Sequence, residues 1–187
     1  MSGGSGAPIW RFTTPNATPL EQGQKTRKAT MSTRADNIAL IENYYACLKS
    51  GDFDALAGLH SDDVAFNMLG STPVSGRWEG KAECFGPLVA DLVVGKLVPG
   101  KHAFAKKWRI MSADDNCVVG IMQGGGPGLN GEQYDQTYCQ VFTISERDGA
   151  PRIVELHEFY DTALVELVLN DNPTAKGQTE IQREFRF

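Results

Sequence analysis

The 187-residue sequence predicts an α+β domain in which a curved antiparallel β-sheet packs on three N-terminal helices. Two patterns carry this prediction. Apolar residues recur mainly at helical spacing between residues 34 and 95. From residue 102 onward the pattern changes to alternating segments separated by turn residues, which is typical of hairpin-connected strands. Such a sheet would curl around the helices and leave one open pocket.

The two ends of the chain differ from this central region. Residues 1–33 begin with the low-complexity run Met1-Ser-Gly-Gly-Ser-Gly and continue with prolines and polar residues. We therefore expect a flexible arm, tag or linker there, and the domain itself over residues 34–170. The polar residues 171–187 are expected to form a C-terminal arm.

Two helices open the predicted domain. Over residues 34–50, apolar side chains such as Ile41 and Leu48 recur at helical spacing, and Gly51 supplies the stop. Asp52 has the side chain of a helix N-cap, so it is expected to begin a short second helix.

A strand and a third helix follow. Residues 63–69 alternate as a strand, and the turn residues of the segment 71–76 end it. The third helix is predicted from residue 80 to about residue 95. Pro87 limits how regular the first turns of this helix can be, because proline has no backbone N–H.

The rest of the predicted sheet lies in the second half of the chain. Strands are predicted over residues 102–112, 117–123, 132–145 and 152–160. The run Gly124-Gly-Gly-Pro-Gly is predicted to be a hairpin turn between two of them. After the last strand, Asp161 has two interpretations: an N-cap for the apolar stretch 163–169, or a residue at the rim of the pocket.

Composition argues against several kinds of function. A formal net charge of −5 does not favour nucleic acid or an anionic membrane as the main partner. No apolar run approaches the roughly 18–20 residues that cross a bilayer. The four cysteines are scattered without a Cys-x-x-Cys pair, and no histidines cluster. We therefore expect reduced thiols, a cytoplasmic location, no metal ion and no organic cofactor.

Segments at both ends of the predicted domain resemble a known family. Residues 41–76 run as a helix, a Gly-Asp turn, a short helix and a strand that ends in a Gly/Pro/Ser turn. Residues 134–142 and 152–162 complete the similarity. This order and spacing resemble the ketosteroid isomerases and the SnoaL-like polyketide cyclases of the NTF2-like superfamily. The resemblance covers residues 34–170 and implies a cone-shaped, cystatin-like fold.

The resemblance also assigns roles to particular residues. Ketosteroid isomerases combine a carboxylate base with an oxyanion hole formed by a Tyr and a protonated Asp. The matching positions here are Tyr44 for the oxyanion Tyr, Asn67 for the base, and Cys139 or Gln140 near the protonated Asp. An amide cannot accept a proton at neutral pH, so two of the three groups are replaced. Steroid-type isomerisation by the family mechanism is therefore not expected.

The limonene epoxide hydrolases offer a second template, with an Arg and two Asp residues in the pocket and a Tyr and an Asn that hold the attacking water. Asn67 matches that Asn, and Glu158 matches one of the carboxylates. However, Ala65 stands where the Tyr would be, and residues 117–123 contain no Arg-x-Asp pair. Only the half of the site that activates water resembles the template.

These matches and strand alternation together predict a pocket. If Asn67 faces inward, Ala65 and Leu69 share its face of the strand. Glu158 is then the only carboxylate in the cavity, where loss of hydration would raise its pKa. The predicted catalytic residues are Glu158, Tyr44 and Asn67. The predicted substrate-binding residues are Tyr138, Tyr160, Leu156, Leu69, Ala65 and Asp161.

The predicted ligand is a small, largely hydrophobic molecule that carries oxygen. The favoured hypothesis is cofactor-independent proton transfer, as in isomerisation, cyclisation, dehydration or hydration. Glu158 would be the acid or base, Tyr44 would stabilise an oxyanion, and Asn67 would orient substrate or water. Two alternatives stay open: a non-catalytic binding domain that kept the cavity, and a dimerising scaffold domain.

The outer face of the sheet predicts how the protein assembles. Ile153, Glu155 and His157 alternate onto the face opposite the pocket, and Cys139 and Val141 join them from the neighbouring strand. An antiparallel sheet with apolar residues on its outer face is usually covered, and a two-fold dimer is one way to cover it. We therefore expect a homodimer through the sheet.

Overall fold

The computed structural model describes residues 32–179 and 187, in which helices flank a single six-stranded sheet. The strands are β1 (His60–Met68), β2 (Gly76–Glu79), β3 (Ala103–Ala113), β4 (Cys117–Pro127), β5 (Gln133–Arg147) and β6 (Ala150–Phe159). The α-helices are α1 (Arg34–Ser50), α2 (Phe53–Gly58), α3 (Lys81–Glu83), α4 (Thr162–Leu164) and α5 (Lys176–Thr179). The other helical segments are the π-helices η1 (Cys84–Val93) and η3 (Val165–Leu169) and the 3₁₀ turns η2 (Val94–Lys96) and η4 (Pro173–Ala175).

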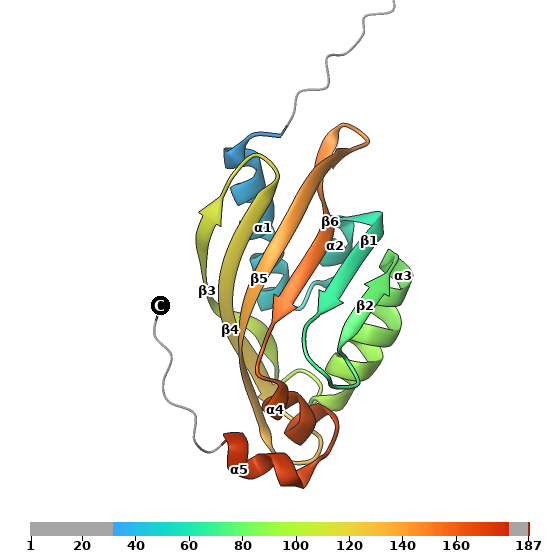
Figure 1. Cartoon of the computed structure of the whole chain (residues 1–187), viewed down its shortest axis with the longest axis vertical. Coiled ribbons are helices and arrows are strands. Elements are labelled where there is room, and N and C mark those ends of the chain that lie inside the picture. Colours follow the sequence, from blue (N-terminus) through green and yellow to red (C-terminus); the bar gives the residue numbers. More distant parts are fainter. Residues whose placement is uncertain (1–31, 180–186) are drawn as a thin grey trace, which may run out of the picture.

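The strand order is β2-β1-β6-β5-β4-β3, and the sheet is mixed (Figure 1). β6 returns between β1 and β5 and pairs with β1 in parallel, whereas all other neighbours are antiparallel. The α+β class is thus confirmed, but the prediction of a purely antiparallel sheet is wrong. Alternation along single strands cannot reveal this pairing, because β1 and β6 are far apart in the sequence.

Helices α1 and α2 lie on one face of the sheet (Figure 1), where α1 contacts β3, β4 and β6. Thr33 begins α1 with a capping box, in which its side chain accepts a hydrogen bond from the backbone of Asp36 and the Asp36 carboxylate bonds back to Thr33. Gly51 ends α1 with a φ of 75°, and Asp52 caps α2, as the sequence predicts. The third helical segment follows β1 and β2 rather than preceding the sheet.

This third segment is irregular around Pro87. Only three residues form the α-helix α3, and the following ten residues, Pro87 included, form the π-helix η1. Proline removes one backbone donor from the helix, which is consistent with the predicted irregularity. Cys84 and Leu88 are nevertheless buried and face the core.

The glycine-rich run predicted as a turn belongs to β4. Residues from Gly124 to Pro127 pair with β5, and the hairpin turn comes afterwards, where the Gly128 N–H bonds to the Glu132 carbonyl. Side chains would not fit in this stretch of β4. A Cβ on Gly124 would collide with the backbone carbonyl of Phe104 in β3, and one on Gly126 would lie 2.7 Å from the Cα of His102, just before β3. The glycines therefore allow close strand approach and do not form the turn.

A second departure concerns the register of β6. Thr143 of β5 pairs with Glu155 and Ile144 pairs with Ile153, so Val154 is an extra residue in β6. This bulge shifts the alternation of β6, and Ile153 is fully buried in the core. The prediction that Ile153 lies on the outer face is therefore wrong. Glu155 and His157 do occupy that face, half-buried, with Val141.

The last strand leads into α4 and η3, whose apolar residues are buried. Asp161 is the N-cap of α4, accepting hydrogen bonds from Ala163 N and Leu164 N, which confirms the capping interpretation. Helical structure continues beyond residue 170, and Ala175 is buried in the core. Most of the predicted N-terminal arm and the residues 180–186 lie outside the described residues.

Candidate functional site

A cavity lies between the helices and the sheet, lined by residues of α1, α2, β1, η1, η3 and the long strands. The cavity has a volume of about 80 Å³, which leaves room for several atoms of a small ligand. Among the residues that the structure describes, every lining side chain except Glu158 is apolar or aromatic. The cavity is therefore suited to a small hydrophobic molecule with few polar groups.

Glu158 supplies the one carboxylate in this lining. It lies near the end of β6, and only 8% of its surface is exposed. Burial raises its pKa from 4.5 to about 7, although a hydrogen bond from Gln140 acts in the opposite direction. A carboxyl group that titrates near neutrality can both take up and release a proton under physiological conditions.

Gln140 of β5 joins Glu158 to Tyr44 of α1. Its Nε2 donates hydrogen bonds to Glu158 Oε2 and, over 3.1 Å, to the Tyr44 hydroxyl. The Tyr44 oxygen thus accepts from Gln140, so its own proton is free to point elsewhere. Burial, and secondarily the charge of Glu158, raises the pKa of Tyr44 well above its usual value. Tyr44 therefore stays a neutral phenol, which can donate a hydrogen bond.

Three further tyrosines line the same cavity. Tyr138 donates a hydrogen bond of 3.2 Å to Tyr134, and the Tyr160 hydroxyl lies 3.3 Å from Ser75 Oγ. Burial raises the pKa of each phenol. The cavity consequently offers neutral hydroxyl groups around a single titratable carboxyl.

No protein family model matches the chain, and no curated protein is significantly similar in sequence. Solved structures do match. An NTF2-like protein from Burkholderia xenovorans LB400 is 19% identical with a TM-score of 0.55, covering 75% of this chain and 100% of that one. A ketosteroid isomerase-like protein from Erwinia carotovora atroseptica SCRI1043 is 15% identical with a TM-score of 0.53, covering 68% and 95%. A protein with a cystatin-like fold from Xanthomonas campestris is 20% identical with a TM-score of 0.54, covering 72% and 98%.

The chain has an NTF2-like fold. The NTF2-like, cystatin-like fold that the sequence resemblance implies is thereby confirmed, whereas the cone shape stays a prediction. At these identities the likeness concerns the fold alone, and one fold hosts many unrelated functions. The chemistry must therefore be argued from the side chains of this chain.

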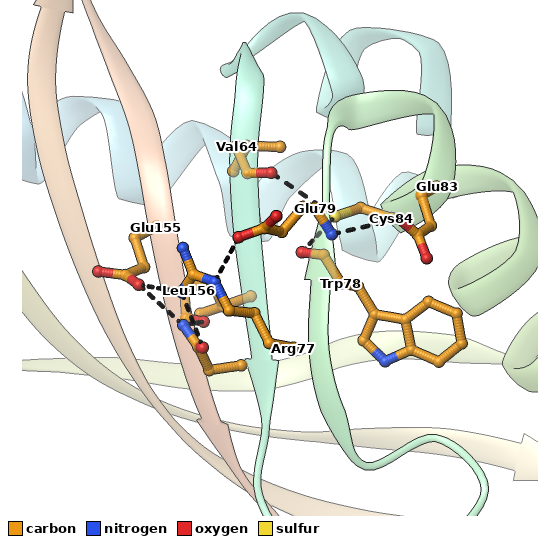
Figure 2. Close-up of polar contacts among 9 residues, drawn as sticks. Val64, Arg77, Trp78, Glu79, Glu83, Cys84, Glu155 and Leu156 are labelled. Carbon is orange, nitrogen blue, oxygen red and sulfur yellow. Dashed lines mark hydrogen bonds and ion pairs between the residues drawn. The ribbon is translucent and has the colours of Figure 1, made fainter.

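Asn67 does not line the cavity. The prediction that Asn67 lies in one pocket with Tyr44 and Glu158 is therefore wrong. Asn67 lies on the opposite face of β1, where its Nδ2 donates to Glu155 Oε1 over 3.0 Å. Arg77 Nη1 donates to both Asn67 Oδ1 and Glu155 Oε1, at 3.0 and 2.7 Å. Figure 2 shows Arg77 of β2 reaching toward Glu155 of β6, while Trp78 points the other way.

The face of β1 that lines the cavity carries Phe66 and Met68 instead. Successive side chains point to opposite faces of a strand, so the placement of Ala65 and Leu69 in the cavity is wrong for the same reason. The physical cause is solvation: an aromatic ring and a thioether fill an apolar cavity, whereas the Asn67 amide finds charged partners on the outer face.

The other predicted residues divide into two groups. Leu156, Tyr138 and Tyr160 line the cavity together with Tyr44 and Glu158. Asp161 is not among the lining residues, because its carboxylate is occupied as a helix cap. The family template places Cys139 or Gln140 near the protonated Asp, but Gln140 was not among the predicted site residues. Alternation along β5 from Tyr138 places it on the inner face.

His60 is buried next to the cavity without lining it. Its Nδ1 lies 2.9 Å from the Leu56 carbonyl, and the aromatic rings of Tyr44, Phe66 and Phe85 pack against its ring. Burial lowers its pKa to about 4, so the ring is neutral at physiological pH. His60 therefore belongs to the core.

Two further findings concern the described residues only. Within residues 32–179, no three His, Cys, Asp or Glu side chains are grouped so that they could hold a metal ion. In the same range no helix combines the length and the apolar character that a bilayer crossing requires.

Proposed function

We propose that this protein catalyses cofactor-independent proton transfer on a small, mostly hydrophobic molecule that carries a carbonyl or similar oxygen. The reaction would be an isomerisation, cyclisation, dehydration or hydration. Glu158 is the group that takes a proton from the substrate and returns it at another position. Tyr44 donates a hydrogen bond to the substrate oxygen as negative charge develops on it.

The observation that carries this proposal is the environment of Glu158. A carboxyl group is costly to bury without a charged partner, and the pKa of Glu158 rises to about 7 for that reason. Titratable groups with strongly shifted pKa values inside a cavity are typical of functional sites. A base is most effective when its pKa lies near the working pH, and the pKa of Glu158 meets this condition.

Gln140 and Tyr44 support the same proposal. The Gln140 amide fixes one carboxyl oxygen of Glu158 and leaves Oε1 for a ligand. The same amide donates a hydrogen bond to the Tyr44 oxygen, so the Tyr44 proton is available to a bound molecule. An acceptor for a proton and a donor for the developing charge are the two elements that enolisation-type chemistry needs.

The test is a screen of hydrophobic ketones, epoxides and polyketide-like lactones, followed by product analysis with wild type and Glu158→Gln. This substitution keeps the shape of the side chain and removes its capacity to exchange a proton. We expect kcat to fall by roughly 10²–10⁴ while ligand affinity is largely kept. Equal product formation by the two proteins would eliminate Glu158 as the catalytic group.

A second candidate is a non-catalytic domain that binds the same kind of molecule. The observation that favours it concerns the described residues: apart from Glu158, none that lines the cavity titrates near neutrality, since the tyrosine pKa values are all raised. A protein of this kind would bind members of the panel and form no product. Glu158→Gln would then change affinity slightly and nothing else.

A further inference from the structure

A second hollow adjoins the cavity and differs from it in charge. Its volume is about 60 Å³. The side chains of Val74, Val165 and Leu169 line both the hollow and the cavity. Within residues 32–179, Lys96 is the only cation that lines either space, and it belongs to the hollow. The two spaces thus share three apolar side chains and differ in charge, because Lys96 lines the hollow and Glu158 lines the cavity.

The hollow forms where three irregular segments meet. Leu92 and Lys96 come from the end of η1 and from η2, and Val165 and Leu169 come from η3. The turn between β1 and β2 contributes Pro73 and Val74. In Figure 1 the β1–β2 turn lies beside α4, at the lower end of the sheet. Both π-helices line the cavity as well, and π-helical turns are often found at functional sites.

Lys96 is exposed, and among the described residues its ammonium group has no carboxylate within ion-pair distance. The cation is therefore available to an anionic group on a bound molecule. Ionised Glu158, which lines the cavity and not the hollow, would repel such a group. The charges of Lys96 and Glu158 together favour one orientation of a ligand that has a single acidic end.

We propose that this hollow is the entrance to the cavity and that the ligand is a hydrophobic carboxylic acid whose carboxylate is bound by Lys96. Its apolar body passes Val74, Val165 and Leu169 and fills the cavity. Its second oxygen-bearing group reaches Glu158 and Tyr44. The inference rests on the proposed function for the location of this second group, but binding of the carboxylate at Lys96 does not depend on any reaction.

The test uses ω-phenylalkanoates with three to eight methylene groups and their matched primary amides, with affinities measured by calorimetry. An amide has nearly the shape of the carboxylate and no charge. We expect the wild type to prefer the acid over the amide by about fivefold at the best chain length, and we expect added salt to weaken this preference. Lys96→Gln should bind acid and amide equally.

Lys106→Gln is the control, because it removes the same charge from an exposed lysine that pairs with Asp135 on the sheet. It should keep the preference for the acid, and so should Glu158→Gln. A preference that survives in Lys96→Gln, equal binding of acid and amide by the wild type, or no binding at all would each overturn the inference. Acid binding through Lys96 without turnover of any substrate would support it and count against the proposed enzymatic function.

Discussion

The side-chain amide of Gln140 donates a hydrogen bond to the buried carboxyl group of Glu158. This bond counteracts the effect of burial on the pKa of Glu158 and holds one of its oxygens in place. Gln140 is itself fully buried, and it bonds to Tyr44 with the same nitrogen. The amide is thus a positioning group for both residues that we assign to the reaction.

Removing this amide should raise the pKa of Glu158 further. In Gln140→Leu the carboxylate loses its donor, and hydrogen bonds to charged groups are worth enough to shift a pKa by about one unit. Carbon NMR of labelled glutamate would report the titration directly. Gln136→Leu is the matched control, because Gln136 is buried on the same strand but bonds to Asp161. An unchanged Glu158 pKa in Gln140→Leu would contradict this role.

Burial of Glu158 should make stability depend on pH. Its pKa rises from 4.5 in the unfolded chain to about 7 in the fold, so the native state binds the proton more tightly. The stabilisation of the fold by the protonated Glu158 carboxyl is fully present below about pH 4.5 and is lost as the pH rises through 7. The shift corresponds to a loss of about 3 kcal/mol. Glu158→Gln should therefore be more stable than wild type at pH 8, with a much smaller difference at pH 5.

Urea unfolding at several pH values measures this difference. Glu83→Gln, which changes an exposed carboxylate on α3, serves as the control for a general charge effect. If Glu158→Gln were no more stable than wild type at pH 8, the carboxyl group would not carry the burial cost assigned to it.

The residues on the outer face should not affect catalysis. Asn67→Ala is expected to leave ligand affinity and turnover unchanged, because Asn67 bonds to Glu155 and Arg77 and not to the cavity. Arg77→Ala should change stability only slightly, since the arginine is half exposed and solvent screens its ion pair with Glu155. Steady-state kinetics and urea unfolding test the two variants. A large loss of turnover in Asn67→Ala would restore its predicted catalytic role.

We propose that the outer face of the sheet forms a homodimer. Pairing across the strands places Val119, Val141 and His157 in one row, and Ile121 and Cys139 in the next beside Phe159, which is 48% exposed. Val141→Glu puts a charge in the centre of this apolar area and should give a monomer. Sedimentation of wild type should show twice the 20.4 kDa chain mass at micromolar concentration. A wild-type monomer would exclude this dimer.

Some features of this architecture follow from local sequence and others do not. Gly51 ends a helix and Asp161 begins one through their own backbone and side-chain chemistry. Local sequence therefore predicts the role of Gly51 and offers the N-cap as one of two interpretations of Asp161, although its predicted place among the substrate-binding residues is wrong. The bulge at Val154 and the close approach of Phe104 in β3 to Gly124 depend on neighbouring strands that no local pattern reveals. The parallel pairing of β1 with β6 has the same origin.

The candidate site shows a different kind of error. Along β1, Val64, Phe66 and Met68 are all apolar, so simple alternation predicts the face that lies inward. The match of Asn67 to a family template was preferred to that pattern. It placed the wrong face of β1 toward the cavity, which is an error of one residue in register. On β6 the template and the alternation agree, and Leu156 and Glu158 do line the cavity.

Hydrogen exchange into a bound ketone tests the central claim most directly. A hydrophobic ketone that binds the protein is incubated in D₂O, and deuterium at the carbon next to the carbonyl is followed by NMR. The account predicts that wild type incorporates deuterium and that Glu158→Gln does so roughly 10²–10⁴ times more slowly, with Tyr44→Phe in between. Equal incorporation by wild type and Glu158→Gln, or none above the solvent rate in wild type, would contradict it.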